Sequence, residues 1–177
     1  AEDLPAGVKA PVSQLLDVPV EWERAVAAVL GANISAFVVA DVSVARQVMA
    51  HASVSEAPLT LIPLSAVGEP VVLAPVDAQV VGAASSVVRC LPEHQRVIDL
   101  LLGGAVLVRD NEAAFRIAPA LGPGGCAVAP DGLVVHGDCR IVKPGRETGA
   151  ALLAQERVWR SLPDKIQSAL QVVQQLD

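Results

Sequence analysis

The sequence predicts an α/β (α+β) protein of two lobes, each a small sheet with flanking helices, followed by a C-terminal helix of coiled-coil type. Two observations predict this fold. Short valine-rich runs of strand type alternate with segments whose apolar residues recur at helical spacing. A long closing segment then keeps helical spacing. We therefore expect lobe I over residues 1–75, lobe II over residues 76–146 and the C-terminal helix over residues 147–177.

The composition is that of a folded chain with one sizeable core or two small ones. Of its 177 residues, 53% are hydrophobic and 18% are charged, which excludes a disordered protein. Pro, Gly or a charge interrupts every valine-rich stretch, so no apolar run reaches the roughly 20 residues that a membrane-spanning helix needs. We therefore expect no membrane partner. The three cysteines lack paired spacing, which fits a reducing cytoplasm.

In the first lobe, helical and strand-type segments alternate. Apolar spacing and β-type runs predict a helix at Pro19–Leu30 ending at Gly31, a strand at Ala36–Ala40, a helix at Val44–Ala52 and a strand at Leu59–Leu64. Either Asp41 or Ser43 can cap the second of these helices, because each side chain can accept a hydrogen bond from a free backbone N–H. Residues 65–85 lack a helical period, so we place the boundary between the lobes there.

The second lobe repeats this alternation and then adds a hairpin. Its expected elements are a helix at Glu93–Leu102 ended by Gly103-Gly104, a strand at Ala105–Val108, a helix from Asp110 to about Ala120, two strands within residues 126–137 and a third at Arg140–Val142. Asp131-Gly132 is the turn signal between the two hairpin strands. The order helix, glycine, strand, acidic cap, helix thus occurs in both lobes, as an internal repeat.

The C-terminal helix is expected to begin at Glu147 and to be interrupted at Pro163. Proline removes an intrahelical hydrogen bond and clashes with the preceding turn, so it should kink or restart the helix. Beyond it, apolar residues recur at near-heptad spacing, which is typical of a coiled coil: Ile166, Leu170, Val173 and Leu176.

Charge is distributed unevenly along the chain. Residues 1–139 hold 7 Lys/Arg against 15 Asp/Glu, whereas residues 140–177 hold 6 against 4. This basic end has two interpretations, a solvated helix face or a surface that contacts the DNA backbone without reading its sequence. The candidate DNA-binding residues are Arg140, Lys143, Arg146, Arg157 and Arg160.

Motifs for catalysis, metals or nucleotides are not recognisable. Gly122-Pro123-Gly124-Gly125 is not followed by Gly-Lys-Ser/Thr, so we interpret it as a loop. His136, Cys139 and Cys126 lack the second short-spaced pair that a zinc site needs. We therefore expect no catalytic residue, no metal, no cofactor and no small-molecule substrate. The alternative is a small α/β enzyme or ligand-binding domain, since such folds share these strands and loops.

An ordered set of segments resembles the hinge domain of SMC (structural maintenance of chromosomes) proteins. The set begins with Gly7–Val18 and the helix to Gly31, continues through Val38-Val39-Ala40-Asp41 and Leu61-Ile62-Pro63-Leu64, and returns with Leu101-Leu102-Gly103, Val106–Asp110 and Val128–Val135. The similarity covers about residues 6–145. One departure is that His136–Cys139 and Lys143–Arg146 carry single glycines where the family usually has glycine pairs.

The resemblance implies a homodimerisation hinge that joins two coiled-coil arms of a chromosome-segregation and condensation ATPase in the cytoplasm, at the nucleoid. ATP binding would belong to parts of a longer protein, and the start at Ala1 without an initiator methionine leads us to expect a fragment. An unpaired strand edge could continue its sheet into a partner. On this basis, the expected interface residues are Leu61, Gly132, Val134, Val135, Gly137 and Ile141.

Overall fold

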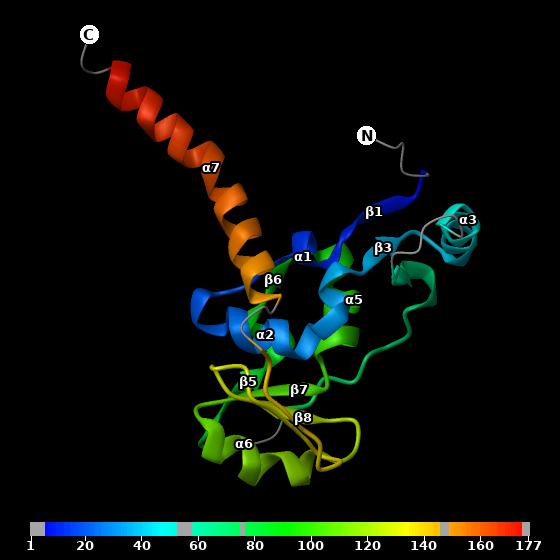
Figure 1. Cartoon of the computed structure of the whole chain (residues 1–177), viewed down its shortest axis with the longest axis vertical. Coiled ribbons are helices and arrows are strands. Elements are labelled where there is room, and N and C mark those ends of the chain that lie inside the picture. Colours follow the sequence, from blue (N-terminus) through cyan, green and yellow to red (C-terminus); the bar gives the residue numbers. More distant parts are fainter. Residues whose placement is uncertain (1–5, 53–57, 75–76, 146–148, 175–177) are drawn as a thin grey trace.

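The computed structural model describes residues 6–52, 58–74, 77–145 and 149–174 (Figure 1). Two sheets lie one above the other along the long axis of the molecule, with helices between them, and the C-terminal helix projects from the body beside the first sheet (Figure 1). The mixed α and β architecture predicted from the sequence is therefore confirmed. None of the helices in these described ranges is long and apolar enough to cross a bilayer.

The first sheet has three strands in the order β1-β3-β4. Its central strand β3 (Phe37–Val39) pairs antiparallel with β1 (Val8–Pro11) and parallel with β4 (Leu61–Pro63). Helix α3 (Val42–Ala52) begins after Asp41, whose Oδ1 accepts hydrogen bonds from the backbone N–H groups of Ser43 and Val44, at 2.7 and 3.0 Å. Of the two capping candidates, Asp41 is therefore the cap.

The second sheet has five strands in the order β10-β9-β8-β7-β5. These are β10 (Ile141–Val142), β9 (Val134–His136), β8 (Cys126–Val128), β7 (Ala105–Val108) and β5 (Val80–Ala83). The predicted hairpin with its third strand is confirmed, and Gly132 adopts the positive φ of 91° that this turn requires. Strand β5 lies in the segment where no element was predicted, because its sequence is short and contains Gly82 at a bulge.

The internal repeat is confirmed, and it extends further than the sequence indicated. Repeat I runs through β1, α1 (Val12–Leu15), β2 (Leu16–Asp17), η1 (Val20–Trp22), α2 (Glu23–Leu30), η2 (Gly31–Ser35), β3, α3, β4 and η3 (Leu64–Ala66). Repeat II runs through β5, α4 (Ala84–Val87), β6 (Arg89–Cys90), η4 (Pro92–His94), α5 (Gln95–Leu102), β7, α6 (Asn111–Ile117), η5 (Ala118–Leu121) and β8. The helices predicted at Pro19–Leu30 and Glu93–Leu102 thus each begin with a separate 3₁₀ turn, η1 and η4.

The two repeats meet along an antiparallel pair of very short strands, β2 and β6, in which Leu16 lies opposite Cys90. The main hydrophobic core crosses this junction, since it combines Val26 and Leu30 from α2 with Ile98 and Leu102 from α5. A second cluster lies between α6 and the outer face of the five-stranded sheet. All strands of the three-stranded sheet precede residue 75, and all strands of the five-stranded sheet follow residue 76. The division into two lobes stays a proposal, because both parts contribute to one core.

Helix α7 (Ala150–Gln174) runs without interruption through Pro163, so the predicted break is wrong (Figure 1). Proline removes one hydrogen bond, to the carbonyl of Trp159, but the side chain of Trp159 is exposed, so water can reach this part of the helix. Residues around Pro163 are mostly good helix formers, which supports continuity across one missing bond. Leu176 of the predicted heptad lies outside the described residues, and Arg146 does too.

Candidate functional site

The strand β4 is the first candidate edge, because none of the strands that the structure describes pairs with its outer side. Its counterpart in repeat II, β8, has the antiparallel strand β9 on the equivalent side. The same supersecondary unit therefore accepts one further antiparallel strand in repeat II and leaves that position open in repeat I. Proline at position 63 is typical of an edge strand, where its missing N–H removes no ladder bond.

The hydrogen-bond pattern shows which backbone groups of β4 face outwards. The N–H of Phe37 donates to the carbonyl of Thr60 at 2.9 Å, and Phe37 lies opposite Leu61 in the parallel register. In a parallel ladder, a residue bonds to the two neighbours of the residue that lies opposite it, and the opposite residue itself points its N–H and C=O away. Phe37 therefore bonds to the neighbours of Leu61 and not to Leu61. The backbone groups of Leu61 are therefore directed towards the open edge.

Strand β10 is the second candidate edge, at the end of the five-stranded sheet. The N–H of His136 donates to the carbonyl of Arg140 at 2.8 Å, and Ile141 lies opposite Val135. Antiparallel ladders alternate bonded and non-bonded pairs, so Ile141 belongs to a non-bonded pair and directs its N–H and C=O outwards. The Ile141 side chain is 58% exposed. Leu61 and Ile141, both expected interface residues, thus direct their backbone groups towards two different edges.

The remaining expected interface residues have intramolecular roles. Val134 and Val135 are buried in β9, which is paired on both sides. A Cβ added to Gly137 would lie 2.0 Å from the carbonyl oxygen of Gly122, and one added to Gly132 would lie 2.9 Å from the side chain of Pro144. These glycines are thus required for packing within the chain, and the chain's own core encloses the two valines.

The candidate basic residues do not form one cluster. Arg140 is exposed beside β10 and forms an ion pair with Asp138 at 2.9 Å, and Lys143 is exposed after the same strand. Arg157 and Arg160 instead lie on α7 and contact the body of the protein. Arg157 Nε lies 2.7 Å from Glu23 Oε1, and the Arg160 guanidinium donates to backbone carbonyls. The last two arginines are therefore engaged in holding α7.

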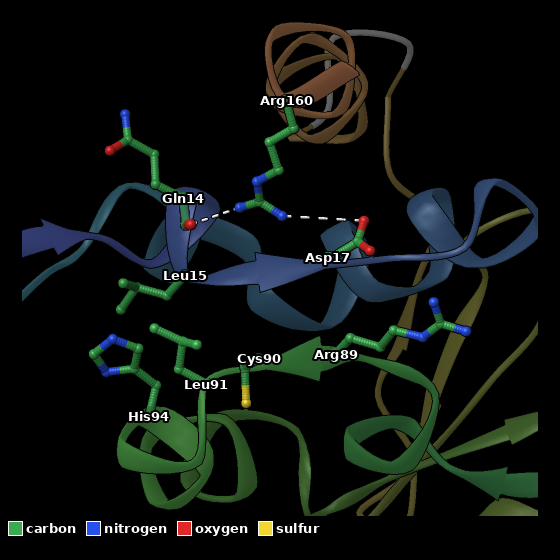
Figure 2. Close-up of a pocket in the computed structure, with 8 residues that line it drawn as sticks. All are labelled: Gln14, Leu15, Asp17, Arg89, Cys90, Leu91, His94 and Arg160. Atoms are coloured by element: carbon green, nitrogen blue, oxygen red, sulfur yellow. Dashed lines mark hydrogen bonds and ion pairs between the residues drawn. The ribbon is translucent and has the colours of Figure 1, made fainter. Parts of the chain in front are cut away.

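The contacts of Arg160 lie beside a hollow of about 300 Å³ where the two repeats meet (Figure 2). Arg160 Nη1 donates to the carbonyl of Leu16 at 2.8 Å and Nη2 to that of Gln14 at 2.5 Å, while Asp17 lies at 4.0 Å. His94 from η4 also lines this hollow and is buried. The side chain of Arg89 projects away from His94, so the polar groups of the hollow do not converge (Figure 2).

The cysteines interpreted as poor zinc ligands lie in different settings. Burial raises the pKa of the Cys126 thiol to about 11, against a smaller lowering by the Arg140 charge, so this thiol stays protonated. Cys139 is exposed in the turn between β9 and β10 with a φ of 72°. Within the described ranges, no three His, Cys, Asp or Glu side chains come together as metal ligands would.

A family model and a solved structure both relate this chain to the hinge domain of SMC proteins. Residues 5–118 match the family model of the flexible hinge domain of SMC proteins. The structure is similar to the SMC hinge domain of Geobacillus stearothermophilus, crystallised as an asymmetric dimer, with a TM-score of 0.86 and 25% identity over 99% of this chain and 74% of that one. No curated protein matches the chain.

Two further solved structures share the fold at lower identity. The SMC hinge domain of Pyrococcus furiosus has a TM-score of 0.67 and 20% identity over 78% of this chain and 73% of that one. The folded elbow of cohesin has a TM-score of 0.72 and 16% identity, with 99% of this chain and 26% of that one covered. The fold of this chain therefore recurs in proteins with very different sequences.

Proposed function

This chain belongs to the family of SMC flexible hinge domains, and we propose that it joins two copies of itself at the ends of two coiled-coil arms. Hinge domains are dimerisation modules without catalysis of their own. The observation that carries the proposal is the pair of open edges, one on each repeat, with outward-facing backbone groups at Leu61 and Ile141. The asymmetric hinge dimer of Geobacillus stearothermophilus supports it by analogy.

In the proposed dimer, β4 of one copy pairs with β10 of the other. A two-fold axis repeats the contact, so two junctions form and every open edge at these positions is used. The pairing is antiparallel, because β8 in repeat II already accepts β9 in that way at the equivalent edge. Apolar side chains at Leu61, Ile141 and Val142 then lose contact with water at each junction. The buried Gly132, Val134 and Val135, together with the half-buried Gly137, hold β10 in place for this pairing.

Proline variants at the two outward-facing positions test this arrangement by sedimentation at several concentrations. Ile141→Pro and Leu61→Pro each remove an N–H that points to the open edge and leave the ladder within the chain intact. We expect each variant to sediment as a monomer where the unaltered chain is dimeric. A mixture of the two variants should recover part of the dimer, because one junction then joins two unaltered edges.

Val142→Pro is the matched control, since Val142 bonds inwards to β9. It should lower the stability of the fold, whereas Ile141→Pro should leave the circular dichroism spectrum and the melting temperature nearly unchanged. A dimer that survives both Leu61→Pro and Ile141→Pro would overturn the proposal. If only Ile141→Pro gives a monomer, the pairing of β4 with β10 is wrong and β10 pairs with itself.

We also propose a weak, sequence-independent contact with DNA, restricted to the exposed side chains of Arg140 and Lys143 beside β10. Arg157 and Arg160 are engaged with the body, and Arg146 lies outside the described residues. Fluorescence anisotropy with a labelled duplex should show binding that weakens steeply with added salt and falls further in Lys143→Ala. Binding that salt does not alter would contradict this part of the proposal.

The place of this chain in the cell follows from the family as a proposal. We propose that it is part of a longer SMC protein that organises and segregates chromosomes at the nucleoid in the cytoplasm. Binding and hydrolysis of ATP would then take place in other parts of that protein, at the far ends of the arms.

A further inference from the structure

The contacts that the C-terminal helix makes with the body change in kind along its first three turns. Ala150, Leu152 and Leu153 come first and pack against the main core, where Leu153 is 4% exposed. Polar contacts through Glu156, Arg157 and Arg160 follow. From Pro163 to Gln167, the side chains are exposed. The helix is thus held by an apolar base and a polar band above it.

The polar band has two points of attachment on repeat I. Arg157 Nε donates to Glu23 Oε1 at 2.7 Å, and Glu23 is buried at the first turn of α2. Arg160 donates from both terminal nitrogens to the carbonyls of Leu16 and Gln14. Those carbonyls belong to β2 and to the end of α1, so α7 is attached to two separate elements (Figure 2).

We propose that Arg157 and Arg160 are positioning residues that fix the direction in which α7, and any arm that continues it, leaves the hinge. Apolar packing at Leu153 is non-directional, so by itself it would allow α7 to pivot. Arg160 lies seven residues later, about 10 Å further along the helix axis. Contacts at both Leu153 and Arg160 fix the direction of the helix axis, whereas a contact at Leu153 alone fixes only one point on it.

The guanidinium group has the geometry for this role. Its planar fork offers parallel donors that hold two acceptors at once, which an ammonium group on a flexible stem does not. If Arg160 is released so that the helix gains about 1 Å of sideways freedom at that point, the end of α7 at Gln174 gains about 3 Å, because it lies three times as far from the pivot at Leu153. A long arm would amplify it in proportion. The inference concerns one chain and holds whether or not two copies pair.

Spin labels test the inference in the 177-residue chain. One label replaces Arg96 on α5 and the other Lys165 on α7, both exposed positions, with Cys90 changed to Ser and Cys139 to Asn so that neither takes a label. Labelled chain is diluted into an excess of unlabelled chain, so that each measured distance lies within one molecule. We expect a narrow distance distribution for this chain, and a distribution at least twice as broad for Arg160→Met, which keeps the aliphatic stem.

Arg160→Lys should broaden the distribution nearly as much, because the charge is kept and the fork is lost. Arg157→Met removes the hydrogen bond to Glu23 and should also broaden the distance distribution. Arg116→Met is the matched control, since this exposed guanidinium on α6 is paired with Asp77 at 3.1 Å, far along the chain from α7. The control should leave the distribution unchanged. An unchanged width in both Arg160→Met and Arg157→Met, with the helix content intact, would overturn the inference. Sedimentation of Arg160→Met should match that of the unaltered chain, which separates this result from the pairing of copies.

Discussion

Repeat I and repeat II have the same succession of strands and α-helices, but different structures occupy their outer edges. In repeat II the edge of β8 is covered by β9, and β10 follows. In repeat I the corresponding edge of β4 is open. Strand β7 is buried along its whole length, whereas β3 begins with the half-buried Phe37. One unit of this kind therefore supports either an internal hairpin or an exposed edge.

This difference indicates a division of roles between the repeats. The hairpin satisfies the β8 edge inside the chain and carries the open edge one sheet position outwards, to β10. Among the residues that the structure describes, repeat I has no such addition, and in the proposed dimer its β4 edge would receive the strand from another copy. In the proposed dimer, this difference between two similar halves would supply the two sides of each junction, β10 from one copy and β4 from the other.

The largest expected effect comes from detaching the hairpin that distinguishes repeat II. In Gly137→Ala, the new methyl group would lie 2.0 Å from the carbonyl oxygen of Gly122 and 3.0 Å from that of Ala118. Both obstacles are backbone atoms, so a side-chain rotation cannot relieve the clash. We expect a loss of about 3 kcal/mol in the free energy of unfolding, measured by urea denaturation.

Gly124→Ala provides the matched control, because no atom lies within 4 Å of a Cβ added there. Its free energy of unfolding should stay within about 0.5 kcal/mol of the starting value. If Gly137→Ala is equally mild, the hairpin is held loosely and β10 is not a fixed edge of the five-stranded sheet.

Much of the fold could be predicted from the sequence, since apolar periodicity and capping residues are local signals. The helices at α2, α5 and α6 and the strands β3 and β7 follow directly from them. The strands β2 and β6 could not be predicted, because two residues show no alternation and the pairing joins residues more than 70 positions apart. Strand β5 was not predicted either, because it is short and Gly82 interrupts its apolar run.

The candidate site was predicted less completely. Leu61 and Ile141 were placed on strands correctly, but which edges remain open depends on the order of strands in each sheet. Gly132 and Gly137 were among the expected interface residues, and the structure shows that each is closely packed within one chain. The basic residues Arg157 and Arg160 give no sequence signal that separates solvated from anchoring side chains, because Glu23 and Gln14 lie far away in the sequence.

The smallest expected effect concerns the equivalent helix caps of the two repeats. Asp110 Oδ1 accepts a hydrogen bond from Ala113 N–H at 2.8 Å, and Asp41 caps α3 in the same way. Asp110→Ala should cost about 1 kcal/mol. Asp41→Ala should cost less, because α3 belongs to the less covered repeat and its middle residues are more exposed.

A pH titration isolates the contribution of the Asp41 charge to the start of α3. Hydrogen bonds from the Val44 backbone and from Ser43 lower the pKa of Asp41, so its carboxylate is favoured by folding. The stability from this charge is therefore fully present above the ordinary pKa of aspartate, and it is lost as the pH falls through the lower pKa of the folded state. Asp41→Asn keeps the capping oxygen without the titration. Thermal melts should thus show a flatter acid limb for Asp41→Asn than for the unaltered chain. If the melting temperatures of the two proteins fall equally as the pH is lowered, the Asp41 charge adds nothing to the stability of the start of α3.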